Sequence, residues 1–198
     1  METKLPLAVF GLVTDVQYAN YPNKISNGKM RYYRDSLNHI NKAIKSWQAE
    51  NTSLKLILQL GDLIDGKCQK QPYAAMAKVL QEFEQMSNSK VLHLWGNHEM
   101  YNFSRYKLKK TPLNTAKHLN QSESDGNYFT FDVTDKIVLI CLDYYEIVHS
   151  TLFNRYGKKT DTDLEEVDKL LQAADRDPVK ELHNKKRILF SGGIDWLG

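Results

Sequence analysis

Short apolar runs alternate with amphipathic segments along the first half of the chain. The runs are rich in branched residues, as buried parallel strands are, and they occupy residues 6–14, 54–60 and 91–95. Between them, apolar residues recur at helical spacing, which predicts helices over residues 31–50 and 73–86. This strand-helix alternation predicts an α/β fold with a parallel sheet and right-handed crossovers.

The second half has a less regular pattern. Two apolar segments, 127–133 and 136–144, predict a hairpin or two adjacent strands. Apolar positions on one face predict a helix over 163–175, and the polar segment 102–126 is expected to be a long loop. Because no repeat, low-complexity stretch or linker divides the sequence, we interpret residues 1–198 as a single domain.

Composition excludes several classes of protein. The chain is 41% hydrophobic and 26% charged, as globular domains are. No stretch approaches the roughly 18 consecutive apolar residues of a membrane span, and the first residues lack the features of a cleaved signal peptide. The net charge of +3 is too small to indicate nucleic-acid binding. We therefore expect a cytoplasmic protein with no membrane or nucleic-acid partner, in which Cys68 and Cys141 are free thiols.

Polar residues follow each of the three apolar runs of the first half. They are Asp-Val-Gln at 15–17, Gly-Asp-Leu-Ile-Asp-Gly at 61–66 and Gly-Asn-His-Glu at 96–99. Because the carboxyl ends of parallel strands share one edge of a sheet, we expect these three segments to converge. Taken singly, each is explained by a turn or a helix cap. Their occurrence at three successive strand ends favours a functional site.

The side chains expected at this edge suit a divalent cation. Carboxylate and amide oxygens bind Mn²⁺ or Mg²⁺, and such oxygens are supplied by Asp15, Gln17, Asp62 and Asn97. A carboxylate on the middle strand could bridge two ions, which together would activate a water and neutralise a phosphate. His98 could donate a hydrogen bond or a proton to the phosphoryl group. The sequence leaves two roles open for Glu99, which either orients His98 or caps the following turn.

The same segments resemble the signature blocks of the calcineurin-like metallophosphoesterases. "GDLIDG" and "GNHE" are similar to the second and third blocks, and "DVQ" stands where most members have Asp-x-His. Within that superfamily, "RYYRDSL", "QLGDLIDG" and "WGNHEMYNFSR" are similar to the manganese-dependent ADP-ribose/CDP-alcohol diphosphatases. The resemblance extends from about residue 8 to residue 145.

This resemblance implies a metal-dependent hydrolase with a metallophosphoesterase-like αββα sandwich. The implied reaction cleaves the phosphoanhydride bond of ADP-ribose, CDP-choline and related nucleoside-diphosphate conjugates. The implied cofactor is a pair of Mn²⁺ ions, with Mg²⁺ as an alternative. Asp15 and Gln17 would bind one ion, Asn97 the other, and Asp62 both, while His98 would assist at the phosphate.

The chain departs from the family pattern in its second half. The family has a metal-binding His at another strand end and a Gly-His-x-His block, and this sequence contains neither. We therefore interpret the chain as a C-terminally truncated domain that is inactive or weakly active and self-associates through an uncovered sheet. Two alternatives stay open: a non-catalytic nucleotide- or partner-binding fragment, and another metallophosphoesterase such as a phosphodiesterase or nuclease.

Candidate substrate contacts flank the predicted metal site. Arg31 and Arg34 surround two tyrosines, in positions where an arginine could bind a phosphate and a tyrosine could stack on a base. The alternative is that Tyr33 belongs to the core and the arginines are solvated. Four residues that follow the third block are also expected to line the nucleotide pocket: Tyr101, Asn102, Phe103 and Arg105.

Overall fold

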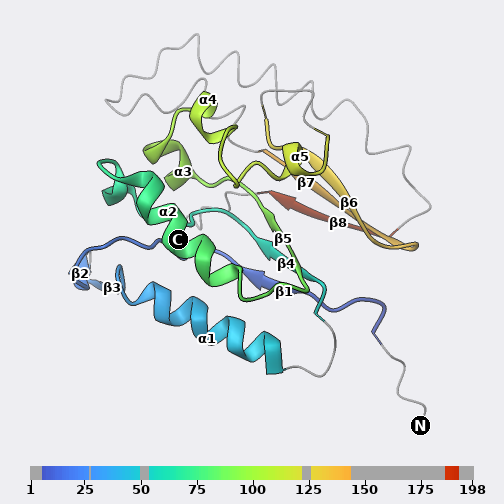
Figure 1. Cartoon of the computed structure of the whole chain (residues 1–198), viewed down its shortest axis with the longest axis horizontal. Coiled ribbons are helices and arrows are strands. Elements are labelled where there is room, and N and C mark those ends of the chain that lie inside the picture. The colour runs from blue at the N-terminus through green and yellow to red at the C-terminus, as the bar shows by residue number, and fades with distance from the viewer. Residues whose placement is uncertain (1–5, 27, 50–53, 122–125, 144–185, 192–198) are drawn as a thin grey trace.

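The computed structural model describes residues 6–26, 28–49, 54–121, 126–143 and 186–191. Its first sheet contains three parallel strands in the order β1-β4-β5, namely Gly11–Val13, Leu56–Gln59 and Lys90–His93. Helices α1 (Ser36–Ala49) and α2 (Pro72–Phe83) lie along one face of this sheet (Figure 1). The predicted α/β arrangement with a parallel sheet is confirmed.

Both faces of the first sheet are covered at β4 and β5. Successive side chains of a strand point to opposite faces. Ile57 of β4 accordingly packs in one apolar cluster with Ile44 of α1 and Val79 of α2. Leu58 packs in a second cluster with Leu139, on the opposite face. Each such fully buried side chain contributes about 1.5–3 kcal/mol relative to an exposed one. The face that we expected to be uncovered is therefore packed at β4 and β5, whereas Leu12 of β1, in register with Leu58, is 52% exposed.

A second sheet supplies that cover. It consists of β6 (Phe129–Thr134), β7 (Ile137–Leu142) and β8 (Lys186–Ser191), in that order. β6 and β7 form the predicted antiparallel hairpin, and β8 pairs in parallel with β7. Cys68 and Cys141 are both buried and free, as predicted. The helix predicted over 163–175 lies outside the described residues, so the single-domain interpretation stays a prediction.

The first helix begins later than its apolar spacing predicts. Residues up to Arg31 belong to a small antiparallel hairpin of β2 (Lys24–Ser26) and β3 (Lys29–Arg31). The carbonyl of Tyr33 accepts hydrogen bonds from the Ala19 amide and from the Ser36 hydroxyl. These bonds hold Tyr33 before the first turn of the helix. The prediction of a helix from residue 31 is thus wrong by five residues, because α1 begins at Ser36.

Residues 102–121 contain short helices instead of the long loop that we predicted for residues 102–126. The chain after β5 forms α3 (Asn97–Asn102), α4 (Arg105–Leu108) and α5 (Thr115–His118), and η1 (Gly66–Cys68) precedes α2. Side-chain caps from Ser104 and Asn114 and a 2.8 Å hydrogen bond from Trp95 Nε1 to the Leu113 carbonyl hold this segment. None of the helices in the described ranges is long and apolar enough to span a bilayer.

Candidate metal centre

The segments that follow β1 and β4 run side by side at the carboxyl edge of the first sheet. The amide of Asp15 donates to the carbonyl of Gly61 at 3.2 Å, and the amide of Gln17 donates to the carbonyl of Asp62 at 2.9 Å. The Gln17 side chain lies between two carboxylates, since its Nε2 is 3.0 Å from Asp15 Oδ1 and 3.2 Å from Asp62 Oδ2. The structure therefore brings together Asp15, Gln17 and Asp62, as the sequence predicts.

Asn97, after β5, completes this group. In the orientation that satisfies its hydrogen bonds, its amide nitrogen donates to both carboxylate oxygens of Asp62, at 3.0 and 3.1 Å, and its oxygen accepts from the Tyr101 hydroxyl. The backbone amide of His98 also donates to Asp62 Oδ1 at 2.9 Å. Asp62 thus lies at the centre of the site, with contacts to all three strand ends.

Backbone conformation at this edge is unusual. Asp15, Gln17 and Asp62 have φ values of 54°, 43° and 55°, in the left-handed region that residues other than glycine rarely adopt. Such conformations cost about 1–3 kcal/mol each and occur mainly at functional sites, where the surrounding structure imposes them. Here the three residues with this conformation contact one another through Gln17 Nε2, which donates to the carboxylates of Asp15 and Asp62.

Two glycines allow the strand ends to approach closely. A Cβ atom at Gly61 would lie 2.7 Å from the amide nitrogen of Gly96, and a Cβ atom at Gly96 would lie 2.1 Å from Oδ1 of Asp62. Gly61 also has a φ of 100°, which glycine alone adopts without strain. The glycine before each polar residue is therefore required by the spacing of the two segments.

Glu99 connects the ends of β4 and β5. Its carboxylate is fully buried and accepts hydrogen bonds from the backbone amides of Asp62 and Leu63 at 2.7 Å and of Gly96 at 2.8 Å. Burial, and then the charge of Asp62, raise the pKa of Glu99 to about 7. Of the two roles left open by the sequence, the structure supports the cap and extends it to a second strand end.

The His98 ring is oriented by its hydrogen bonds. Its Nδ1 accepts from the amide of Gly66 at 3.0 Å, so in the neutral ring the proton lies on Nε2, which is 3.9 Å from Asp62 Oδ2. Asn102 holds this segment, since its Nδ2 donates to the carbonyls of His98 and Asp65. Asp65, which sequence reasoning did not single out, lies 3.7 Å from His98 Nδ1 through its Oδ2.

The pKa of Asp62 is set mainly by burial and then by the charges of its neighbours. Burial raises the pKa of its carboxyl above the ordinary value, the neighbouring His98 opposes this, and repulsion from Asp15 adds to it. Among the described residues, no group of three or more His, Cys, Asp and Glu side chains is placed to hold a metal ion. Two carboxylates and two amides must therefore supply any ligand set here. Both amides direct their N–H groups at the carboxylates, which is where a cation would also be attracted. The oxygens of these carboxylates and amides are ligands that a hard divalent ion prefers, so the residues fit such an ion.

A cavity of about 210 Å³ adjoins this edge. Asp15 and Gln17 line it together with Arg31, Tyr32 and His39. Arg31 Nη1 donates to Gln17 Oε1 at 3.3 Å, and the half-exposed Tyr32 ring lies edge-on to the His39 ring, 5.5 Å between centroids. The cavity therefore offers a cationic fork and an aromatic ring beside the carboxylates.

The other predicted substrate residues lie elsewhere. Arg34 donates to Asn20 and is absent from the lining of that cavity, and Phe103 is buried with its ring 5.1 Å from that of Tyr73. Arg105 forms an ion pair with buried Asp143 at 2.5 Å and covers the Trp95 ring. Tyr33 is buried in the core, which agrees with the alternative that the sequence left open.

Comparisons with known proteins agree with this geometry. The calcineurin-like phosphoesterase family matches residues 8–197. The manganese-dependent ADP-ribose/CDP-alcohol diphosphatase of Xenopus laevis is 32% identical over 97% of this chain and 60% of its own length. Proteins of the same name from Bos taurus and Arabidopsis thaliana are 37% and 38% identical, over 74% and 72% of this chain and 47% and 44% of their own lengths. The chain thus spans about half the length of these relatives.

A solved structure shares the fold. A dimetal phosphatase from Danio rerio superposes with a TM-score of 0.67, covering 94% of this chain and 69% of its own, at 24% identity.

Proposed function

Because the chain belongs to the calcineurin-like phosphoesterase family, we propose that it is a metal-dependent hydrolase of phosphoanhydride bonds. The proposed substrates are nucleoside-diphosphate conjugates such as ADP-ribose and CDP-choline, in line with the name of its relatives. The same name supports Mn²⁺ as the cofactor, with Mg²⁺ as an alternative. The observation that carries the proposal is the position of Gln17 Nε2 between the carboxylates of Asp15 and Asp62.

The ligands proposed for the metal are the four residues of the carboxyl edge: Asp15, Gln17, Asp62 and Asn97. When bound, the ion would supply an activated water and neutralise phosphate charge. His98 would donate its Nε2 proton to a phosphoryl oxygen, because Gly66 holds the other ring nitrogen as an acceptor. Glu99 would keep the strand ends in register without contacting the substrate.

The cavity beside the edge is the proposed location of the rest of the substrate. Arg31 would bind a phosphate oxygen pair through its planar fork, a geometry that lysine cannot reproduce. Tyr32, half exposed in the lining, would stack on the base or the sugar-linked group. Tyr101 would act by holding Asn97, since its hydroxyl donates to that side chain.

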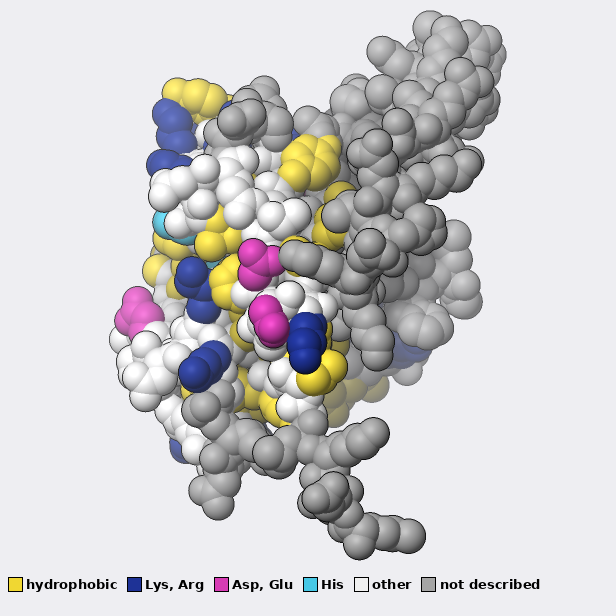
Figure 2. Space-filling view, turned by 90° about the vertical axis from the view of Figure 1, so that its right-hand side faces the viewer, with side chains coloured by type: hydrophobic (Ala, Val, Ile, Leu, Met, Phe, Trp, Pro, Cys, Tyr) yellow, Lys and Arg dark blue, Asp and Glu magenta, His cyan; other side chains and the backbone are white. Residues whose placement is uncertain are grey.

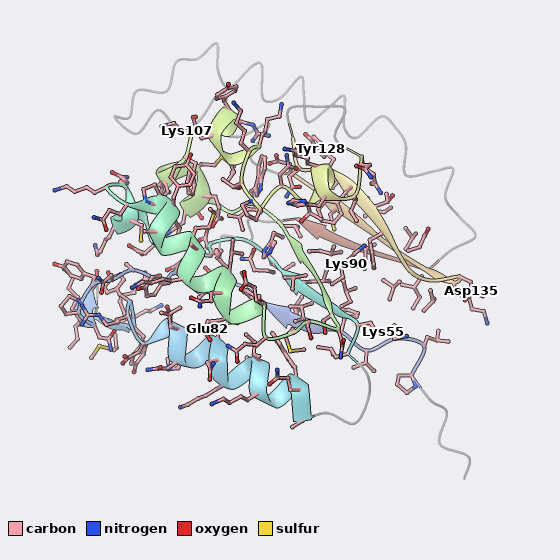
Figure 3. The ribbon with its side chains drawn as sticks, viewed as in Figure 1. Lys55, Glu82, Lys90, Lys107, Tyr128 and Asp135 are labelled. Atoms are coloured by element: carbon pink, nitrogen blue, oxygen red, sulfur yellow. The ribbon has the colours of Figure 1, made fainter. Side chains whose placement is uncertain are left out.

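Metal binding and hydrolysis are tested with one substitution and a matched control. Asp62→Asn removes the central carboxylate charge, and Asp135→Asn makes the same change in the turn between β6 and β7, where Asp135 is exposed (Figure 3). We expect calorimetry to show Mn²⁺ binding that Asp62→Asn reduces at least about tenfold and Asp135→Asn leaves unchanged. Product formation from ADP-ribose should follow Mn²⁺ binding, and p-nitrophenyl phosphate should be a poor substrate. Equal Mn²⁺ affinity in both variants would contradict the proposed site.

A second candidate function is nucleotide binding without turnover. It is favoured by the ligand set, which in the described residues contains amides where imidazoles or further carboxylates would hold a second ion more tightly. Weak or absent activity of this chain is part of the proposal for that reason. Mn²⁺-dependent binding of ADP-ribose with no product over hours would establish this second function.

Self-association is proposed through β1, which lies at the end of the first sheet in the described residues. The expected uncovered face is packed at β4 and β5, and on the described part of the side seen in Figure 2 hydrophobic side chains lie in small groups among charged ones. Leu12 of β1 is 52% exposed, however, although it is in register with Leu58 on the face that the second cluster covers. Within the described residues, β1 has one hydrogen-bonded neighbour, β4. Size-exclusion chromatography with light scattering should show association that Leu12→Lys weakens; a monomer at all concentrations would exclude it.

A further inference from the structure

A second cavity, of about 270 Å³, lies behind the metal-binding edge. Its walls come from the segment after Gln17, from η1 and from the first two turns of α2, and they include Tyr21, Lys67 and Lys78. The beginning of α2 and the β2-β3 hairpin lie at the same end of the molecule (Figure 1). The proposed function does not use this cavity.

The charged side chains in the described lining of this cavity are lysines. Lys67, Lys70 and Lys78 line it, and no Asp or Glu belongs to its described lining. None of these lysines forms an ion pair within the part of the chain that the structure describes. Gln71, at the N-cap of α2, makes no side-chain cap, so the positive end of a twelve-residue helix adds to the same field. The carboxylate of Asp65, whose charge acts on Cys68 of the lining, lies outside that lining, and three lysines within the lining favour an anionic occupant.

The cavity also presents an aromatic ring. Tyr21 is 43% exposed, and Lys67 Nζ lies 5.7 Å from its centroid. Its ring is held edge-on against buried Tyr33, with 5.7 Å between centroids. A fixed, partly exposed ring beside ammonium groups can stack on a planar group while the lysines bind a phosphate.

The buried thiol at the base of the cavity is unreactive. Cys68 Sγ donates to the carbonyl of Tyr18 at 3.2 Å, and burial raises the pKa of this thiol to about 11. Because the thiolate is the nucleophile and the metal ligand, Cys68 offers neither chemistry near neutral pH. The cavity is therefore suited to reversible binding.

We propose that this cavity binds a nucleoside monophosphate, with its phosphate on the lysines and its base on Tyr21. The volume of about 270 Å³ lies just below the usual range for small-molecule sites, about 300–1,000 Å³, so a dinucleotide-sized conjugate such as ADP-ribose exceeds it. The site is distinct from the metal-binding edge and needs no metal. Two lining residues lie next to the edge in the sequence: Tyr18 follows Gln17, and Lys67 follows Gly66, whose amide donates to His98 Nδ1.

The test is calorimetric titration of the chain with AMP in the presence of EDTA, which prevents binding through a metal. We expect AMP to bind and adenosine, which lacks the phosphate, to bind at least about tenfold more weakly. Lys70→Gln and Lys78→Gln should each weaken AMP about 5–50-fold. Lys45→Gln, at an exposed position of α1, removes the same charge and should leave AMP affinity unchanged. Tyr21→Leu should weaken AMP but leave inorganic phosphate unaffected.

The results separate this site from the proposed active site. Asp62→Asn should leave AMP binding in EDTA intact, even if it abolishes Mn²⁺ binding. Absence of AMP binding would overturn the proposal. An equal loss of AMP affinity in Lys45→Gln and Lys70→Gln would also overturn it, because the binding would then be general electrostatic attraction. Loss of AMP binding in Asp62→Asn alone would assign the nucleotide to the metal-binding edge and would also overturn it.

Discussion

Glu99 is expected to be a main determinant of stability at the metal-binding edge. Its carboxylate accepts hydrogen bonds from three buried backbone amides, at 2.7, 2.7 and 2.8 Å, which belong to the ends of two different strands. Glu99→Ala would leave all three donors without this acceptor. Glu99→Gln would keep one oxygen and turn an NH₂ group toward amides that are themselves donors.

The magnitude follows from those three donors. A buried donor without an acceptor costs about 1–3 kcal/mol, so the upper sum for Glu99→Ala is about 9 kcal/mol. Water entering the space vacated at the edge of the sheet would satisfy part of this, which brings the expected loss to about 3–6 kcal/mol. Because domains are stable by about 5–15 kcal/mol, Glu99→Ala is expected to unfold much of the protein. Glu99→Gln, which keeps one acceptor, is expected to cost about 2–4 kcal/mol.

Equilibrium unfolding in urea, followed by circular dichroism, measures this loss. The measurement is made at pH 8, above the pKa of about 7 to which burial raises the Glu99 carboxyl. Glu84→Gln, the same chemical change at an exposed residue just after α2, is the control and should shift stability by less than about 0.5 kcal/mol. The midpoint should fall for Glu99→Gln with an unchanged slope. Equal midpoints for the two variants would refute the inference that Glu99 connects the strand ends.

Three further predictions concern neighbouring residues. Burial lowers the pKa of His93 to about 4, so protonation favours the unfolded chain. The contribution of His93 to stability should therefore fall by up to about 3 kcal/mol as pH falls from about 6.5 to 4, whereas the raised pKa of Glu99 acts in the opposite direction. The His93 part is the pH dependence of the difference in stability between the wild type and His93→Gln in urea titrations. Gly96→Ala should weaken Mn²⁺ binding at least about tenfold by calorimetry, because its Cβ would lie 2.1 Å from Asp62 Oδ1. Gly28→Ala, whose Cβ would meet nothing within 4 Å, is the control for Mn²⁺ affinity, although its φ of 73° means that it should lower stability. His98→Ala should lower kcat about 10²–10⁴-fold in an active preparation while Mn²⁺ affinity is retained; loss of affinity would make His98 a ligand.

Local features of the fold were predictable because periodicity reports burial within a few residues. The spacing of apolar residues located β4, β5, α2 and the β6-β7 hairpin to within a few residues. The start of α1 was wrong because Arg31 pairs with Lys24 in a hairpin whose strands have only three residues each, with their apolar residues, Ile25 and Met30, exposed. The loop prediction for 102–126 failed for a related reason, since its short helices are stabilised by side-chain caps and by contacts to β5.

The sequence by itself determined which polar residues meet, because parallel strands bring their carboxyl ends to one edge whatever the intervening helices contain. It did not determine what each polar side chain binds. Glu99 pairs with amides 36 and 37 residues away, and Arg105 with Asp143, 38 residues away. Such partners depend on how the loops pack, and the local spacing of apolar and polar residues carries no information about that packing. The cover of the first sheet is likewise a tertiary result, because Leu58 is buried by a hairpin that begins at Phe129.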